Sequence, residues 1–305
     1  MLFTVELLAC IVLCLRQLRN PSTTTAVLLG LAGGAAVLTR PIAIGIPFFL
    51  ALVVGFGTQA THSQRMLRAI IVLAASLGLC APWLARNVVR FGVPLASSAE
   101  AEVLLIHDAA PFLAHRTDAP LANIRTQLRG EADSLALAAG RSPQWGLSLR
   151  ARQIMLEHPV AYALYHLRAS LNSLLPSVTD LADVTGVRPS GRNAQAALAG
   201  SGLSAAVARY GGLPSATASA IAATLQTWLL LQAALIVSGI AVAARTWGVA
   251  VAAVLGGPTI LLLAATGGAA VPRLSVPVYG LVILLAASTI AFILRVGVTM
   301  RAQPM

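Results

Sequence analysis

Long apolar runs recur along this chain, and short segments that contain arginine separate them. A helix needs about 20 apolar residues to cross the hydrocarbon core of a bilayer, and fewer where its flanking side chains reach the interface. Seven runs approach this length: Leu2 to Leu15, Thr24 to Leu38, Ile42 to Phe56, Ala69 to Ala85, Thr217 to Ala244, Trp247 to Thr266, and Ser275 to Leu294. Only Thr39-Arg40-Pro41 separates the second and third, so a re-entrant hairpin fits there as well as two spans. We predict an all-α membrane protein with six or seven transmembrane helices.

The composition agrees with a lipid environment. Hydrophobic residues make up 57% of the 305 residues and charged residues only 10%, with a mean hydropathy of +0.82, whereas soluble domains are about 25% charged. The net charge of +11 comes entirely from arginine, because the sequence has no lysine. These arginines lie between the apolar runs and do not cluster beside aromatic side chains, which argues against a nucleic-acid partner. The cysteines, Cys10, Cys14 and Cys80, lie inside apolar runs and predict neither a disulfide nor a metal site.

Composition also divides the chain into three parts. Residues 1–89 hold four apolar runs, residues 216–305 hold three, and residues 90–215 form an insert between them. Nine of the ten acidic residues, all but Glu6, lie between Glu100 and Asp183. Because lipid-facing helices avoid such charges, we predict that the insert is solvated, folded and partly helical.

The clearest element of the insert is an amphipathic helix over residues 159–175. Apolar residues recur there at helical spacing beside aromatic and polar ones: Val160, Leu164, Leu167, Leu171 and Leu174 alternate with Tyr162, Tyr165, His166 and Arg168. This pattern is typical of a helix that lies on the membrane surface or against the spans. Residues 188–214 are rich in Gly, Ser and Ala and predict a loose linker to the fifth run.

Arginine counts predict the orientation, because cytoplasmic loops keep positive charge while long domains are translocated regardless of charge. One side holds Arg16, Arg19, Arg65, Arg68, Arg245, Arg295 and Arg301; the other holds Arg40, Arg86, Arg90 and Arg273. The first side is therefore predicted to be cytoplasmic and the insert, with Met1, periplasmic. The first run begins at residue 2 without a basic n-region, so we expect a truncated or fragmentary chain; the alternative is a natural first helix with its N-terminus outside.

Three arginines on the insert side are the best functional candidates. Arg40 lies between the second and third runs, Arg86 follows the fourth, and Arg273 precedes the seventh. A guanidinium keeps its charge at physiological pH and binds phosphate through paired donors, so these residues suit the phosphate of a lipid carrier. The alternative is that each side chain simply reaches the interface at the end of a span.

Polar residues of the insert predict no metal or acid/base site. The candidates are His107, Asp108, His115, Asp118, His158, His166, Asp180 and Asp183. The first four are irregularly spaced in a segment with Pro111 and Pro120 and no helical register, which disfavours a metal cluster. We interpret the last two histidines as polar residues of an interfacial helix, and the last two acids as capping or loop residues. No catalytic residue, metal ligand or cofactor motif is therefore assigned.

Several motifs, taken in order, resemble those of the bacterial GT-C glycosyltransferases, the superfamily of protein mannosyltransferases and aminoarabinose transferases. The most specific is PWLARN at 82–87 followed by RFGVP at 90–94, which is similar to that group's exit into the periplasm. The weaker matches are LGLAGGAAVLTRP at 29–41, EHP at 157–159, RLSVP at 273–277 and TVELL at 4–8. Together they extend over essentially the whole chain.

The resemblance implies a membrane transferase that moves a sugar from a polyprenyl-phosphate donor to a periplasmic lipid, glycan or protein acceptor. It makes Arg40, Arg86, Arg273, Asn87 and Glu6 candidates for contacts with the donor phosphate or substrate. Members of the group have a catalytic carboxylate in the loop after their first span, and this sequence matches only regions downstream of it. Pro272 also replaces the aromatic residue usual beside the late arginine.

Two other functions remain open from the sequence. A transporter or flippase-like protein would use broken Gly- and Pro-containing spans, such as residues 30–47, and would need acids within the bilayer, where Glu6 alone is close. A non-catalytic membrane partner would keep the fold without the base. In each case the expected location is the bacterial inner membrane, in contact with the lipid bilayer.

Overall fold

The computed structural model describes residues 2–57, 60–172 and 215–266, together with 282, 283, 285–287 and 289. All regular structure in these residues is helical, without a strand, as predicted. Contacts divide the chain into two compact units. We name them the bundle unit, residues 1–81, 231–262 and 276–305, and the insert unit, residues 82–230 and 263–275.

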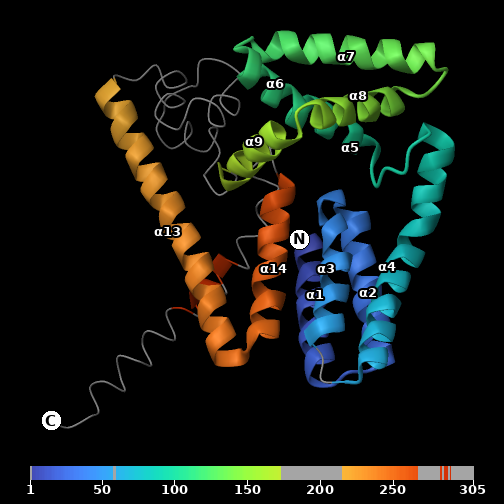
Figure 1. The fold of residues 1–305 in the computed structure, drawn as a ribbon, viewed down its shortest axis with the longest axis vertical. Helices are drawn as coiled ribbons and strands as arrows, with labels where there is room; N and C mark the ends of the chain where they lie inside the picture. The colour runs from blue at the N-terminus through green and yellow to red at the C-terminus, as the bar shows by residue number, and fades with distance from the viewer. Residues whose placement is uncertain are drawn as a thin grey trace. The chain divides into compact units, whose positions relative to one another are not determined.

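The N-terminal helices follow the first four apolar runs. They are α1 (Leu2–Arg19), α2 (Thr23–Thr39), the short 3-10 helix η1 (Pro41–Ile44), α3 (Gly45–Gly57) and α4 (His62–Phe91). In the bundle unit, α1, α2 and α3 lie side by side (Figure 1). Most exceed the apolar run that predicted them, and α4 extends into polar sequence at both ends.

The breaks between these helices have local causes. Ser22 caps α2 by accepting a hydrogen bond from the backbone N–H of Thr25, as serine commonly does at a helix start. Arg40 is extended, with φ −143° and ψ 111°, because a residue that precedes proline is disfavoured in the helical region. Pro41 then starts η1, where its missing N–H leaves no helical bond unmade.

Close packing of α2 on α4 depends on the Gly30-x-x-x-Gly34 pattern. A Cβ at Gly30 would lie 2.5 Å from the Val72 carbonyl oxygen, and one at Gly34 would lie 2.9 Å from that of Ser76. The Ser76 hydroxyl donates to the Gly30 carbonyl oxygen at 2.6 Å across this contact. Small residues at this spacing let helix backbones approach where no hydrophobic effect drives association.

Two further long helices follow the insert: α13 (Ser215–Trp247) and α14 (Val249–Thr266). They match the fifth and sixth predicted runs and meet at Gly248, whose φ of +93° suits glycine. The seventh run and Arg273 lie outside the described residues, apart from single helical positions between 282 and 289.

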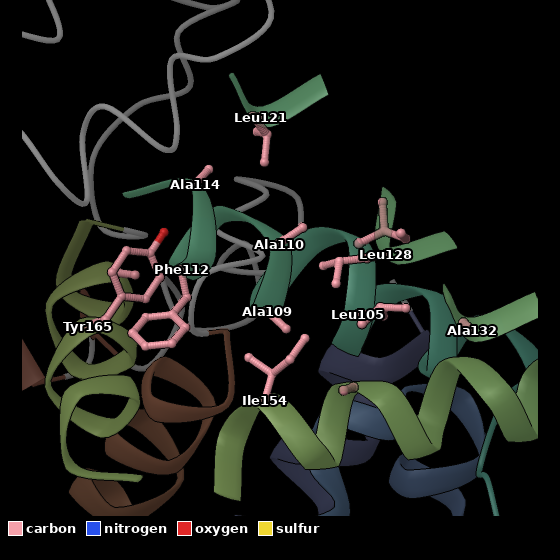
Figure 2. Packing of buried hydrophobic residues seen from close by; sticks show 13 residues of the cluster. Leu105, Ala109, Ala110, Phe112, Ala114, Leu121, Leu128, Ala132, Ile154 and Tyr165 are labelled. Atoms are coloured by element: carbon pink, nitrogen blue, oxygen red, sulfur yellow. The ribbon is translucent and has the colours of Figure 1, made fainter. Parts of the chain in front are cut away.

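The described part of the insert is a small helical assembly. Its elements are α5 (Ser98–Glu102), the π-helical turn η2 (Val103–Ala109), α6 (Ala110–Thr117), α7 (Leu121–Ala138), α8 (Pro143–Glu157) and α9 (Pro159–Asn172). One apolar core joins η2, α6, α7, α8 and α9, and Figure 2 shows Phe112 and Tyr165 lying together where α6 meets α9. This core supports a folded insert.

The prediction that residues 107–118 lack helical register was wrong. The chain is helical from Ser98 to Thr117, and Pro111 is in the first turn of α6, where proline is tolerated. The helix ends only at Asp118, which is left-handed with φ 52°. The π-helical turn shifts the apolar spacing by one residue. The regular helical period is therefore interrupted, and the sequence pattern does not indicate a helix.

Helix α9 confirms the amphipathic helix predicted from Pro159, and its described end is Asn172. Its aliphatic stripe faces outward: Val160, Leu164 and Leu167 are 71%, 65% and 58% exposed. Its aromatic and polar face, with Tyr165 at 6% exposure, packs on the insert core. Such a stripe is suited to contact with lipid.

Two helices are long and apolar enough to cross a membrane, namely α4 over His62–Phe91 and α13 over Ser219–Trp247. Only 17% and 22% of their most apolar windows is buried, whereas the core helix of a soluble protein would be mostly covered. Shorter apolar helices cover Thr23–Thr39, Pro41–Gly57 and Val249–Ala265. Length and composition therefore suggest membrane association.

The α2–α4 contact predicts a difference between two glycines. Gly30→Ala places a methyl group against the backbone of α4, and we expect it to destabilise the protein by about 1–3 kcal/mol. Gly78→Ala is the matched control, because a Cβ at Gly78 meets nothing within 4 Å. Thermal unfolding in detergent should give a lower midpoint for the first variant only; equal midpoints would contradict this packing.

Candidate functional site

The PWLARN…FGVP motif forms a closed turn where α4 ends. Gly92, with φ +77°, reverses the chain after Phe91. The Trp83 indole N–H donates to the Ala96 carbonyl oxygen and the Asn87 side-chain amide to that of Leu95, both at 2.7 Å. Trp83 and Asn87, on one face of α4, thus hold the loop that follows this helix.

Arg86 lies on the outer side of this turn. Its guanidinium carbon is 4.7 Å from the centroid of the Trp83 ring, and its Nη1 donates to the Asn87 Oδ1 at 3.2 Å. Asn87 is 1% exposed, while Arg86 is exposed. The amide predicted to contact substrate forms hydrogen bonds with both of its atoms, one to the Leu95 carbonyl oxygen and one from Arg86.

The same turn is fixed to α8. The Ser142 hydroxyl, which also caps α8, donates to the Phe91 carbonyl oxygen at 2.5 Å. Trp145 packs with Phe91 against a small core formed by Val93, Leu95 and Ala101. Arg86 is therefore presented by a packed turn of the insert unit instead of an open loop.

Glu6 and Arg40 lie together at one end of the bundle unit. The Thr39 hydroxyl donates to Glu6 Oε1 at 2.8 Å, and the Arg40 guanidinium lies 5.7 Å from the centroid of the Phe3 ring. Glu6 Oε2 is buried without a hydrogen-bond partner among the described residues. The turn between α2 and η1 thus brings a carboxylate and a guanidinium to the start of α1.

The predicted site residues therefore form two described groups. Glu6 and Arg40 belong to the bundle unit, and Arg86 and Asn87 to the insert unit. Arg273 lies outside the described residues.

The structure also contains a buried polar cluster that the sequence analysis missed. Asp108, in η2, is 5% exposed and accepts a hydrogen bond from the Tyr162 hydroxyl on Oδ2. His166 Nδ1 lies 3.3 Å from Oδ1 of the same carboxylate. Tyr162 and His166 are four residues apart on α9 and share a face, so their spacing was the available signal.

The surroundings of His166 favour its protonated form. Its Nδ1 faces the Asp108 carboxylate, and its Nε2 lies 2.7 Å from the Ala264 carbonyl oxygen of α14. Both partners are acceptors, and a neutral imidazole has only one N–H to donate. The hydrogen bond to Asp108 is the largest influence raising the pKa of His166, and it outweighs the lowering by burial.

This side chain contacts the last described turn of α14, in which Ala264 lies. The Ser170 hydroxyl also reaches the Ala264 carbonyl oxygen at 3.3 Å. Two side chains of α9 therefore hold the same carbonyl group of the insert unit.

Other polar side chains of the insert take part in packing. The His115 ring stacks on Tyr165 with centroids 5.9 Å apart, and His158 is 6.2 Å from Phe112. The pKa of His107 is lowered by burial and then by the nearby charge of Arg125. The described residues include no group of three or more His, Cys, Asp or Glu that could hold a metal ion.

No family model, curated protein or solved structure matches this chain in comparisons with known proteins.

His166 predicts a pH-dependent contribution to stability. Because its folded pKa lies above the ordinary 6.5, its contribution is fully present below pH 6.5 and is lost as pH rises through the folded pKa. We expect His166→Gln to destabilise the protein by about 1.5–3 kcal/mol near pH 6 and by less near pH 9. Denaturant unfolding at both pH values measures this difference. An equal effect at both would contradict an imidazolium clamp.

Proposed function

We propose that this chain is a multi-pass membrane glycosyltransferase of the GT-C type, which transfers a sugar from a polyprenyl-phosphate donor to a periplasmic lipid, glycan or protein acceptor. The observation that carries this proposal is the fixed position of Arg86. Trp83 and Asn87 share a specific motif with Arg86, and both hold the turn from which its guanidinium projects.

The chemistry explains why a fixed arginine would be needed. When the bond between sugar and lipid phosphate breaks, negative charge develops on the departing phosphate. A preorganised cation stabilises that charge without first having to reorient. A guanidinium cannot lose its charge in this environment and binds phosphate oxygens in pairs.

The proposed topology has six or seven transmembrane helices with residues 90–215 on the periplasmic side. The two long apolar helices, three shorter ones and the outward stripe of α9 support it. In this arrangement Arg40, with Glu6 beside Thr39, is a second candidate for contact with the donor, and Arg273 is a third. The location is the bacterial inner membrane.

Asp108 does not serve as the acceptor base in this proposal. It is the most buried acid of the described insert, but Tyr162 and His166 occupy its two carboxylate oxygens. A general base needs an oxygen within reach of the acceptor hydroxyl. We therefore assign no catalytic residue and place only donor binding on the described residues.

A second candidate function is transport of a lipid-linked substrate, and Glu6 favours it. Its Oε2 is a buried carboxylate oxygen without a partner among the described residues. It lies next to the helix break at Pro41–Ile44, and charged groups beside broken helices are typical of coupled transporters.

Arg86 gives the direct test of sugar transfer. We expect Arg86→Ala to lower the turnover of a polyprenyl-phosphate sugar by roughly a hundredfold, with an unchanged unfolding midpoint. Arg86→Lys should retain part of the activity, because it keeps the charge but loses the paired donors. Activity is measured with purified protein and a radiolabelled donor.

Arg90→Ala is the matched control for this test. Arg90 lies one turn further along α4, is exposed and stacks near Phe91. Both substitutions remove the same charge from the same helix end, so equal losses would indicate general surface charge. Full activity of Arg86→Ala would refute the phosphate contact.

Reconstituted vesicles separate the two candidate functions. A transporter moves labelled polyprenyl phosphate from one leaflet to the other, and Glu6→Gln should slow that movement. A transferase leaves the lipid's distribution unchanged and modifies only its sugar. Movement by the wild-type protein without sugar transfer would replace the first proposal by the second.

A further inference from the structure

The end of the bundle unit away from Glu6 is strongly cationic. Arginines close α1, open α4 and close the bundle part of α13: Arg16, Arg19, Arg65, Arg68 and Arg245. Glycine contacts place these helix ends together, because a Cβ at Gly57 would lie 2.9 Å from Leu18 and 3.1 Å from Ala250. Similarly, a Cβ at Gly55 would lie 3.0 Å from Met66. The described bundle residues include no acid at this end, since Glu6 lies at the other.

Three buried N–H donors at this end have no acceptor among the described residues. They are Gln17 Nε2, Arg65 Nε and Arg68 Nη1. The other side-chain atom of Gln17, Oε1, accepts the backbone N–H of Ser22 at 3.1 Å, and the residue is 0% exposed. A buried donor without an acceptor costs about 1–3 kcal/mol. Three of them at one end of the unit indicate an acceptor beyond the described residues.

The N-terminus of α2 adds to the positive electrostatic potential at this end of the bundle unit. Helices α2 and α4 run parallel, with Gly30 on Val72 and Gly34 on Ser76. This register brings the first turn of α2 level with Arg65 and Arg68. The N-terminus of a helix presents free N–H groups and a partial positive charge that favour an anion. Guanidinium donors and helix N–H groups together match the oxygens of a phosphate.

The surrounding surface identifies the phosphate as part of a lipid. Leu67 and Ile70, on α4 beside Arg68, are 57% and 61% exposed, and Val12 on α1 is 62% exposed. Apolar side chains contribute nothing to the binding of a free phosphate ion, whereas the acyl chains of a phospholipid pack against them. We infer that this end of the bundle unit binds the headgroup phosphate of an anionic phospholipid. The inference rests on the proposed membrane insertion and does not depend on sugar transfer.

Native mass spectrometry of the full chain in detergent tests this site, with phosphatidylglycerol and phosphatidylcholine as probes. We expect the wild type to retain phosphatidylglycerol preferentially. Arg65→Gln/Arg68→Gln should weaken its apparent dissociation constant for phosphatidylglycerol by roughly thirtyfold, since each arginine near a lipid surface contributes on the order of 1 kcal/mol. Arg116→Gln/Arg152→Gln is the matched control: it removes two exposed charges from the insert and should leave binding unchanged.

The remaining outcomes are decisive. Equal retention of the two lipids by the wild type, or equal losses in the two double variants, would overturn the site. Displacement of phosphatidylglycerol by inorganic phosphate at matched concentration would overturn the assignment to a lipid. If the glutamine pair fails to fold, Arg65→Lys/Arg68→Lys keeps the charges and should still bind more weakly, because lysine lacks the paired donors. The readout needs no sugar, so it can succeed where the glycosyltransferase assay fails.

Discussion

Backbone carbonyl groups near lipid must find hydrogen-bond donors within the chain, because the hydrocarbon provides none. Helices satisfy most of them internally, but each helix end leaves four carbonyls open. In this protein, specific side chains supply the missing donors. Ser142 donates to Phe91, the last residue of α4, and His166 contacts Ala264 in the last described turn of α14. Asn87 donates to Leu95 in the loop that follows α4. The sites of chemical interest occur at and beside these helix ends.

The motif at the end of α4 contains two kinds of residue. Some form hydrogen bonds to backbone carbonyl groups, and another keeps its side chain exposed. Trp83 and Asn87 are committed to carbonyl groups of the loop that follows α4, which leaves Arg86 as the exposed charge of the motif. The cluster on α9 follows the same logic, since Asp108 orients His166 and His166 contacts α14. Of the two candidates that the motif supplied, Arg86 is exposed, whereas Asn87 is hydrogen-bonded within the protein.

Sequence alone predicted the helices well in the uniformly apolar parts of the chain. The apolar runs located α1 to α4, α13 and α14, because long uninterrupted apolar runs are typical of helices. It failed at residues 107–118, where the π-helical turn η2 interrupts the period and Pro111 suggests a break. It also missed Asp108 with His166, because 58 residues separate them and only tertiary packing brings them together. Motif resemblance marked Arg86 as a candidate, but the role of Asn87 needed the loop geometry.

The two ends of the bundle unit differ in how their charges are balanced. At one end, Glu6 lies beside Thr39 and Arg40, so opposite charges are present together. At the other, the described residues include several arginines and no acid, and three buried donors have no acceptor among them. A protein in water could leave such donors to solvent, but buried donors need a fixed acceptor. A bilayer supplies that acceptor at a defined depth as a plane of phosphates. In the proposed topology, the arginines that would orient the chain would also find hydrogen-bond acceptors in that plane.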